Sequence, residues 1–363
     1  MRIDQYCTDH IQKGGLGLSP PVKVLVVDDS RTARAMIRHA FQGHPDLLIT
    51  GEASNPLEAK DMIIKDQPDV ITLDIEMPNI NGLQFLDKIM RLRPIPVVMV
   101  SSLTQRNAEL ALTALQMGAF DCFPKAMSSA PGVNAYAGLP GIVRQAAKSK
   151  PETRAKETKL PASTPERLVW SQDFAVVAIG SSTGGVEALE EVLSGFPPDS
   201  PPIVICQHMP AFFTASFAAR LDKKIEALSI REAQDREVLR RGDVRIAPGG
   251  SHHVTVTLNA RTVTTRLHTG PAVNGHTPSV DVLFDSVTEQ VGKAALGIIL
   301  TGMGQDGAEG LLAMRRSGAW TIAQDKATSV VYGMPRVAAE IGAAAQIVPL
   351  NQISHAAMTA RVR

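Results

Sequence analysis

VKVLVVDDS, residues 22–30, is the stretch from which the fold of this chain is best predicted. Its apolar, β-branched run suits a buried strand, and it ends in two aspartates and a serine. Similar short runs follow in LLITGEA (47–53), VITLD (70–74), PVVMVSS (96–102) and DCFPK (121–125), with helical patterns between them. This alternation predicts βαβ units that build a parallel sheet with helices on both faces.

The texture of the sequence changes after this first set of strands. Residues 126–172 are rich in Pro and Gly and then in Lys, Glu and Thr, a composition that buries little apolar surface and is typical of a linker. The α/β pattern returns with FAVVAIG (174–180), IVICQH (203–208) and ALGIILTG (295–302), and it includes an alternating segment, 252–268, that predicts a β-hairpin. We therefore expect a tail (1–20), an N-terminal domain (21–143), a linker (144–172) and a C-terminal domain (173–363). Both domains are predicted to be α/β, with doubly wound, mostly parallel sheets.

Composition excludes several classes of protein. A length of 363 residues fits two ordinary domains, and the formal net charge of +1 provides no strong field for nucleic acid or anionic membranes. No helix-turn-helix pattern or zinc spacing is present, and no apolar run approaches the roughly 20 residues of a membrane-spanning helix. The three cysteines are expected to be reduced thiols. We expect a cytoplasmic protein with no transmembrane segment and no nucleic-acid partner.

Polar residues stand at the carboxyl ends of four predicted N-terminal strands, where open parallel sheets bind ligands. Asp28 and Asp29 follow the first strand, Asp74 the third, Ser101 the fourth and Lys125 the fifth. Clustered carboxylates raise one another's pKa unless a cation lies among them, and an oxygen-rich site suits Mg²⁺. The alternative for Asp-Asp-Ser alone is a helix cap.

The segments VLVVDDS, TLDIEMPNINGLQFL and VVMVSSL, with Lys125, resemble response-regulator receiver domains, whose fold is flavodoxin-like. The resemblance implies that Asp74 accepts a phosphoryl group from a histidine kinase, with Ser101 and Lys125 contacting the phosphoryl oxygens. Receivers usually have proline after this lysine, whereas Ala126 follows it here. The implied Mg²⁺ site consists of the carboxylates of Asp29 and Asp74, the backbone carbonyl of Glu76 and, through water, Asp28.

AVVAIGSSTGG, residues 175–185, predicts a strand, a glycine-rich turn and the start of a helix. The turn would present Ser182 beside helix amides that favour a developing oxyanion. A serine nucleophile requires a base and a group that orients the base. His208 ends the next apolar strand and Asp306 follows the strand 295–302, so both would reach the same edge of the sheet.

Each of these residues also has a simpler interpretation. The Gly-Ser-Ser-Thr-Gly-Gly turn could bind a phosphate, His208 could be a packed strand-end residue, and Asp306 could cap a turn. Gly180, Ser182 and Gly184 also fit the nucleophile elbow of α/β-hydrolases, but that fold orders its triad serine, acid, histidine. The remaining histidines of hairpin and loop segments receive no role: His252, His253, His268 and His276.

IGSSTGG, CQHMP, RIAPGG, GPAVNGHTPSVDVLF, ILTGMGQDG and WTIAQD together resemble the chemotaxis protein-glutamate methylesterase family, in its receiver-containing form. The resemblance implies Ser182 as nucleophile, His208 as base and Asp306 as orienter, with Thr183 and the Met303 amide near the oxyanion. The implied reaction is hydrolysis of glutamyl methyl esters on methyl-accepting chemoreceptors, with glutamine deamidation as a secondary activity and no cofactor. The alternative is a receiver with a non-catalytic, ligand-binding output domain.

Overall fold

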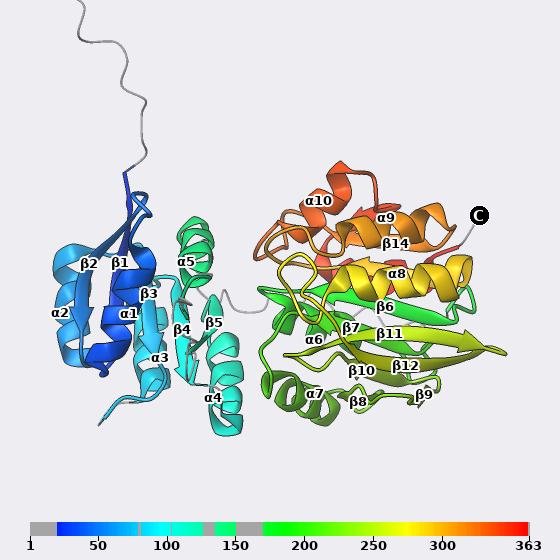
Figure 1. The fold of residues 1–363 in the computed structure, drawn as a ribbon, viewed down its shortest axis with the longest axis horizontal. Coiled ribbons are helices and arrows are strands. Elements are labelled where there is room, and N and C mark those ends of the chain that lie inside the picture. The colour runs from blue at the N-terminus through cyan, green and yellow to red at the C-terminus, as the bar shows by residue number, and fades with distance from the viewer. Residues whose placement is uncertain (1–19, 79–80, 103, 126–134, 150–169, 362–363) are drawn as a thin grey trace, which may run out of the picture.

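The computed structural model describes residues 20–78, 81–102, 104–125, 135–149 and 170–361, which form two α/β domains side by side (Figure 1). The expected tail, most of the expected linker and Ala126 lie outside the described residues. In the part of the chain that is described, no helix has the length and apolar character needed to cross a membrane.

The N-terminal domain contains a five-stranded sheet in the order β2-β1-β3-β4-β5, and all its strand pairs are parallel. This is the flavodoxin-like order, and it confirms the predicted fold class. The strands are β1 (Val22–Val27), β2 (Leu47–Ala53), β3 (Val70–Asp74), β4 (Val97–Ser102) and β5 (Asp121–Lys125). The helices are α1 (Arg31–Phe41), α2 (Pro56–Asp66), α3 (Gly82–Leu92), α4 (Gln105–Gln116) and α5 (Leu139–Lys148).

Local sequence explains where these helices begin. The side chains of Ser30, Asn55 and Thr104 accept hydrogen bonds from backbone amides of the first turns of α1, α2 and α4. Helix α5 continues through 144–148, which the sequence analysis assigned to the linker. The reason is packing, because Val143 and Ala146 both lie buried in the same apolar cluster against the sheet.

The C-terminal domain contains a seven-stranded parallel sheet in the order β15-β14-β13-β6-β7-β10-β8. The strands are β6 (Val176–Ser181), β7 (Ile203–Gln207), β8 (Ser229–Glu232), β10 (Asp243–Ile246), β13 (Ala295–Ile299), β14 (Trp320–Gln324) and β15 (Gln346–Val348). The helices are α6 (Gly185–Ser194), α7 (Phe213–Lys224), α8 (Val280–Gln290), α9 (Ala308–Arg316), α10 (Met334–Glu340) and α11 (Ile353–Thr359), with short 3₁₀ helices at Gly292–Ala294 and Leu350–Gln352.

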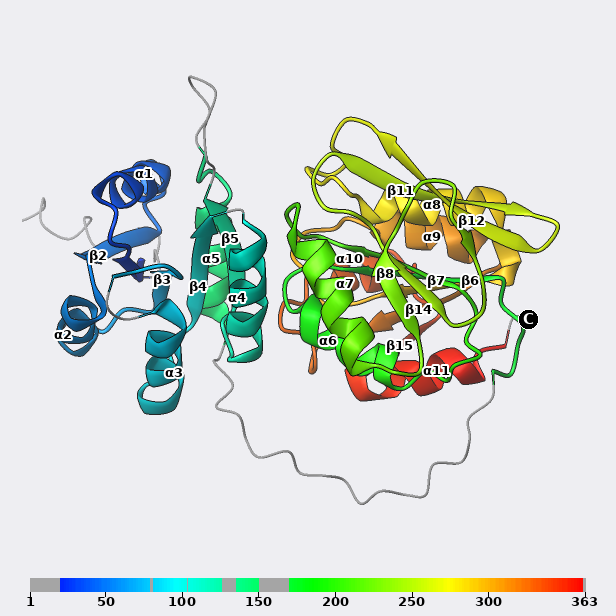
Figure 2. The same cartoon turned by 90° about the horizontal axis from the view of Figure 1, so that it is seen from below.

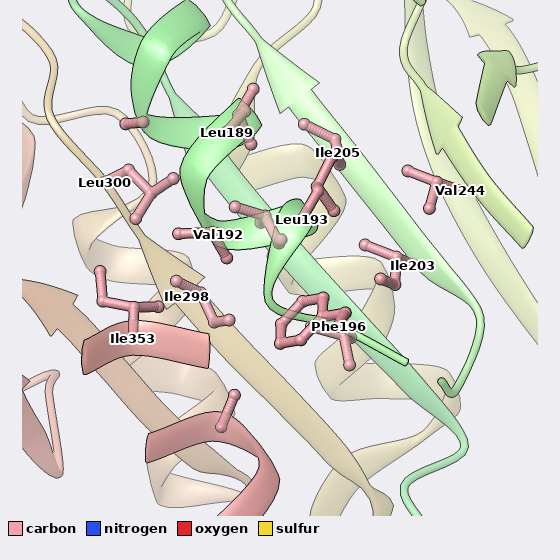
Figure 3. Packing of buried hydrophobic residues seen from close by; sticks show 14 of the residues in the cluster. Leu189, Val192, Leu193, Phe196, Ile203, Ile205, Val244, Ile298, Leu300 and Ile353 are labelled. Atoms are coloured by element: carbon pink, nitrogen blue, oxygen red, sulfur yellow. The ribbon is translucent and has the colours of Figure 1, made fainter. Parts of the chain in front are cut away.

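The predicted hairpin is present as β11 (His252–Asn259) and β12 (Thr262–Thr269), which pair antiparallel. A third strand, β9 (Val238–Leu239), pairs antiparallel with β12. Inside the domain, α6 covers one face of the main sheet. Its side chains Leu189, Val192 and Leu193 pack over strand residues such as Ile203 and Ile298 (Figure 3). This apolar core holds the C-terminal ends of β6 and β7 in fixed positions.

The two domains meet through α4, β5 and α5 of the first and the loops and helices at one end of the second (Figure 2). Leu112 of α4 belongs to the apolar cluster of the C-terminal domain, and Phe213 of α7 belongs to that of the N-terminal domain. Val331 packs likewise in the N-terminal cluster that contains α5. The contact is therefore apolar and continuous with both cores.

Candidate active site

Ser182 lies in a tight turn between β6 and α6. Its amide donates to the carbonyl of Thr301 at 3.0 Å, which ties the turn to the end of β13. Gly184 adopts a left-handed φ of 78°, and a Cβ there would lie 2.6 Å from Val330 Cβ. A Cβ on Gly185 would lie 2.1 Å from Gln207 Oε1. Both glycines are therefore required by close packing, which places Ser182 where the sequence predicted it, at the edge of the sheet.

His208 and Asp306, which are far apart in the sequence, meet in the structure. His208 Nε2 lies 2.8 Å from Asp306 Oδ2, and both side chains are buried. Because a carboxylate accepts at Nε2, that nitrogen carries the proton and Nδ1 holds the free lone pair. Nδ1 is buried and has no hydrogen-bond partner among the described residues. It is the nitrogen available to act as a base.

The expected bond between nucleophile and base is not formed in this structure. No hydrogen bond joins Ser182 Oγ to His208 within the described residues, although the two residues are connected through the backbone: the His208 amide donates to the Ser181 carbonyl at 3.0 Å. Catalytic hydrogen bonds are often long before substrate binds. The structure thus brings together the predicted base and orienter, with the predicted nucleophile on the adjoining turn.

The carboxylate of Asp306 is surrounded by donors. Besides His208, it accepts hydrogen bonds from Asn274 Nδ2 (3.1 Å), Ser279 Oγ (2.8 Å) and the amides of Val280 (2.7 Å) and Asp281 (3.3 Å). Burial raises the pKa of Asp306, but the bond and charge of His208 and the other donors outweigh it and hold the pKa well below its usual range. Asp306 is therefore a permanent anion at neutral pH.

Sequence reasoning missed several residues of this site. Ser279 both caps α8 and binds Asp306, and Gln207 Nε2 donates to the Ser182 carbonyl at 2.9 Å while its Oε1 accepts from Ser181 Oγ at 2.6 Å. His276, which received no role from the sequence, stacks on His208 with ring centroids 3.7 Å apart. Ser279 is a residue type that commonly caps helices, but nothing local in the sequence indicates its bond to Asp306.

Thr183 and Met303, expected near the oxyanion, both contact the N-terminal domain. Thr183 Oγ1 donates to Asp121 Oδ2 of β5 at 2.5 Å. The Met303 side chain packs in the cluster of α5, and a Cβ on Gly141 would be 3.7 Å from its Cε. The Met303 amide has no acceptor among the described residues, so it remains a donor for an oxyanion.

A cavity of about 750 Å³ opens beside the loop that contains Met303. Its walls come from both domains: Gln145, Lys148, Ser149, 303–305, Lys326, 329–333, Arg336 and Val337.

The acidic residues of the N-terminal domain also converge. Oxygens of Asp28, Asp29 and Asp74 lie within 4.8 Å of one another, and Lys125 Nζ lies 2.8 Å from Asp28 and 2.7 Å from Asp74. Burial raises the pKa of Asp74, Lys125 offsets part of this and Asp28 adds to it, and the resulting pKa is about 6. One ammonium is not enough for three carboxylates, and an all-oxygen set of this kind fits a small divalent cation.

The two remaining predicted residues lie at the same edge. Ser101 is buried near the end of β4, and its hydroxyl donates to the Ser102 carbonyl at 3.3 Å. Glu76 follows β3, and its amide donates to Asp74 Oδ1 at 3.3 Å. Its side chain is exposed.

Comparisons with known proteins agree with this two-domain architecture. A family model described as CheB methylesterase matches residues 177–357, and one described as response regulator receiver domain matches residues 24–136. A protein-glutamate methylesterase/protein-glutamine glutaminase of Caulobacter vibrioides is 52% identical over 92% of this chain and 96% of its own length. The corresponding protein of Agrobacterium fabrum is 50% identical over 93% of this chain and 95% of its own.

A solved structure, the CheB methylesterase catalytic domain of Thermotoga maritima, is 38% identical and covers 50% of this chain and 96% of its own, with a TM-score of 0.49. The Caulobacter and Agrobacterium relatives align over both domains of this chain, and their names describe enzymes, so a receiver with a non-catalytic output domain is not favoured. The chain therefore belongs to the family of receiver-containing CheB protein-glutamate methylesterases.

Proposed function

We propose that this protein hydrolyses glutamyl methyl esters on chemoreceptors by a serine mechanism that phosphorylation of its receiver domain controls. The observation that carries the catalytic part is the buried His208–Asp306 pair, whose Nδ1 has no partner among the described residues and whose backbone is bonded to Ser181, next to Ser182. A merely structural histidine would bury its second nitrogen only with a partner.

In the proposed reaction, Ser182 Oγ attacks the ester carbonyl while His208 Nδ1 accepts the hydroxyl proton. Asp306 holds the Nε2 proton and stabilises the imidazolium that forms. The Met303 amide donates to the developing oxyanion. The imidazolium then protonates the departing methoxide, which leaves as methanol. A water molecule, activated by the same nitrogen, then hydrolyses the acyl-enzyme and releases the glutamate carboxylate. The same attack on a glutamine side chain would release ammonia.

In the receiver, we propose Asp74 as the phosphoryl acceptor, with a histidine kinase as donor. Asp28, Asp29, Asp74 and the Glu76 carbonyl would hold Mg²⁺, which when bound neutralises charge on the carboxylates and the phosphoryl oxygens. Lys125 already contacts Asp28 and Asp74 and would pair with the phosphoryl group. Ser101 would donate to a phosphoryl oxygen. A cytoplasmic location belongs to this proposal, and the free thiols of Cys122 and Cys206 are in keeping with a reducing compartment.

Control would operate through the domain contact. The Thr183 hydroxyl next to the nucleophile is bound to Asp121 of the receiver, and Met303 and Val331 are packed against it. Burial raises the pKa of Asp121 more than the Thr183 bond lowers it, so the contact costs free energy whenever this carboxylate is ionised. A closed state that is only modestly stable suits a reversible switch. Phosphorylation would shift the equilibrium toward separated domains and an accessible Ser182.

Methanol release from methylated receptor membranes tests the esterase. Ser182→Ala in the full chain should lower the rate by several powers of ten, as loss of a triad nucleophile does. Ser194→Ala, on the exposed end of the same helix α6, is the matched control and should leave the rate unchanged. Retention of more than about one part in a hundred of the rate by Ser182→Ala would rule out this nucleophile.

The control mechanism has its own test. Acetyl phosphate with Mg²⁺ should raise methanol release by the full chain toward that of a fragment beginning at residue 170, and Asp74→Asn should abolish the increase. Equal rates for the untreated chain, the treated chain and the fragment would remove the proposed gating while leaving the esterase assignment intact.

A further inference from the structure

His276 is the closest aromatic neighbour of the catalytic base. Its ring lies flat on that of His208, with centroids 3.7 Å apart and planes 7° apart. The ring of His276 makes no hydrogen bond among the described residues. Its only specific interaction is therefore with the face of His208, and a ring retained for hydrogen bonding would have a polar partner.

The backbone holds this ring in place through a tight turn. Val273 and His276 exchange two backbone hydrogen bonds (3.1 and 2.9 Å), and the two central residues, Asn274 and Gly275, have φ of 52° and 81°. Positive φ at both central positions is the geometry of a type I′ turn, for which Asn-Gly is the preferred pair. The sequence itself thus specifies the turn that presents His276.

The same turn is fastened to the carboxylate that orients the base. Asn274 Nδ2 donates to Asp281 Oδ2 at 2.6 Å and to Asp306 Oδ1 at 3.1 Å. The turn therefore contacts both members of the pair, one through a side-chain amide and the other through a ring face. Displacement of the turn would disturb base and orienter together.

His276 has the charge state that this arrangement requires. Burial and then the neighbouring His208 lower its pKa, Asp306 offsets part of the effect, and the resulting pKa is about 4. The groups that face the stacked rings are His208, Asp306 and, beyond Asn274, Asp281. A neutral ring over His208 excludes water from one face and presents π density to the imidazolium, whereas a second cation would oppose its formation.

We infer that His276 is a positioning residue of the esterase site: its ring, presented by the 273–276 turn, fixes the plane of the His208 imidazole so that Nε2 stays on Asp306 and Nδ1 faces Ser182. The inference rests on the proposed serine mechanism. Because Nδ1 has no hydrogen-bond partner in the described part of the chain, the specific contacts there that set the ring plane are the Nε2 bond and this stack. Small errors in the orientation of a base are costly, since a displacement of about 1 Å can reduce a rate about 100-fold.

Three variants of the full chain separate the ring from its nitrogens. His276→Phe keeps a flat ring without nitrogens, His276→Gln keeps a polar group without a ring, and His276→Ala removes both. With acetyl phosphate and Mg²⁺ present and methylated receptor membranes as substrate, Ala and Gln should lower kcat about 10- to 100-fold with KM little changed, whereas Phe should stay within about threefold of wild type. His355→Ala, an exposed histidine on α11, is the matched control and should have no effect.

The outcomes are distinct. Wild-type kcat in His276→Ala overturns the inference, and so does a Phe variant as poor as Ala and Gln, since the nitrogens would then be what matters. A rise in KM with unchanged kcat in the Ala and Gln variants also overturns it, because His276 would then bind substrate. If the Ala variant fails to fold in a thermal melt, the contrast between Phe and Gln still decides. Absence of methanol release from the wild type would instead count against the proposed function.

Discussion

Asp74 and Asp306 are the same residue type in almost the same degree of burial, with 4% and 1% of their surfaces exposed, yet their pKa values move in opposite directions. Asp74 lies beside Asp28 and has one ammonium for a partner, so burial prevails and its pKa rises to about 6. Asp306 accepts hydrogen bonds from two backbone amides and three side chains, so its pKa falls despite burial.

The difference shows that donors around a carboxylate, rather than its depth in the protein, decide which role it can take. A carboxylate with too few donors has capacity left for a cation and a phosphoryl group. A carboxylate with all its positions filled can only hold a charge in place and orient a neighbour. Each domain uses the edge formed by the carboxyl ends of its own parallel strands, one for each of these two purposes.

The largest effect is expected for Asp306→Asn. The amide places an NH₂ group where one carboxylate oxygen stands, so His208 loses the anion that fixes its tautomer. We expect kcat for methanol release to fall by about 10⁴. Asp285→Asn, on the exposed face of α8, is the matched control and should be nearly neutral. A loss below tenfold would mean that Asp306 does not orient the base.

A second test concerns the pH dependence of receiver stability. The folded-state pKa of Asp74 is raised from 3.8 to about 6, so the folded receiver binds this proton more tightly than the unfolded chain does. Protonated Asp74 therefore stabilises the folded receiver. This contribution to the free energy of unfolding is fully present below about pH 4 and is lost as pH rises through about 6, a change of about 2–3 kcal/mol.

Differential scanning calorimetry of the receiver transition checks this expectation. Without divalent cations, Tm should fall between pH 5 and pH 7, and Mg²⁺ should restore it more at pH 7 than at pH 5. Asp74→Asn removes the titrating group, so it should raise Tm at pH 7 and flatten the profile. A Mg²⁺ effect that is equal at both pH values would contradict the assignment of Asp74 as the uncompensated carboxylate.

The smallest expected effect lies at the boundary between the two regions. Burial raises the pKa of Asp121, whose carboxylate is bonded to Thr183 of the other domain. Ionisation therefore opposes closure, and unphosphorylated turnover of the full chain relative to the fragment from residue 170 should rise with pH. Taking the ratio cancels any effect of pH on the esterase chemistry itself, which is common to both proteins.

Asp121→Asn keeps an acceptor for Thr183 but cannot ionise. We expect it to lower the ratio severalfold at high pH and to remove its pH dependence. Asp173→Asn, exposed and outside the domain contact, serves as the control. A higher ratio in Asp121→Asn would show that the charge of Asp121 holds the domains together instead of opposing closure.

Much of this architecture could be predicted from the sequence, because strand ends in parallel sheets meet at one edge. That rule alone placed Asp28, Asp74 and Lys125 together and brought His208 to Asp306. The boundary between the first domain and the linker stays a prediction, because apolar spacing and linker composition overlap at 144–148, where α5 continues.

Other features depend on tertiary placement that local patterns do not encode. The stack of His276 on His208 requires a loop to fold back over the sheet edge, although the Asn-Gly pair marked the turn itself. The Thr183–Asp121 bond joins two domains, so no signal within either segment could have revealed it. The absence of a Ser182–His208 bond in the described structure depends on side-chain orientation, which strand ends do not fix.

The bond between Thr183 and Asp121 has a consequence for the flow of information through the molecule. If a phosphoryl group on Asp74 loosens this contact and thereby admits a receptor glutamyl ester, then thermodynamic linkage requires the reverse effect with equal free energy. A receptor segment occupying the esterase cleft would make the phosphorylated receiver more favourable. The methylated receptor would then act as an effector of its own demethylation. Enzyme molecules bound to methylated receptor would be phosphorylated more readily than free ones.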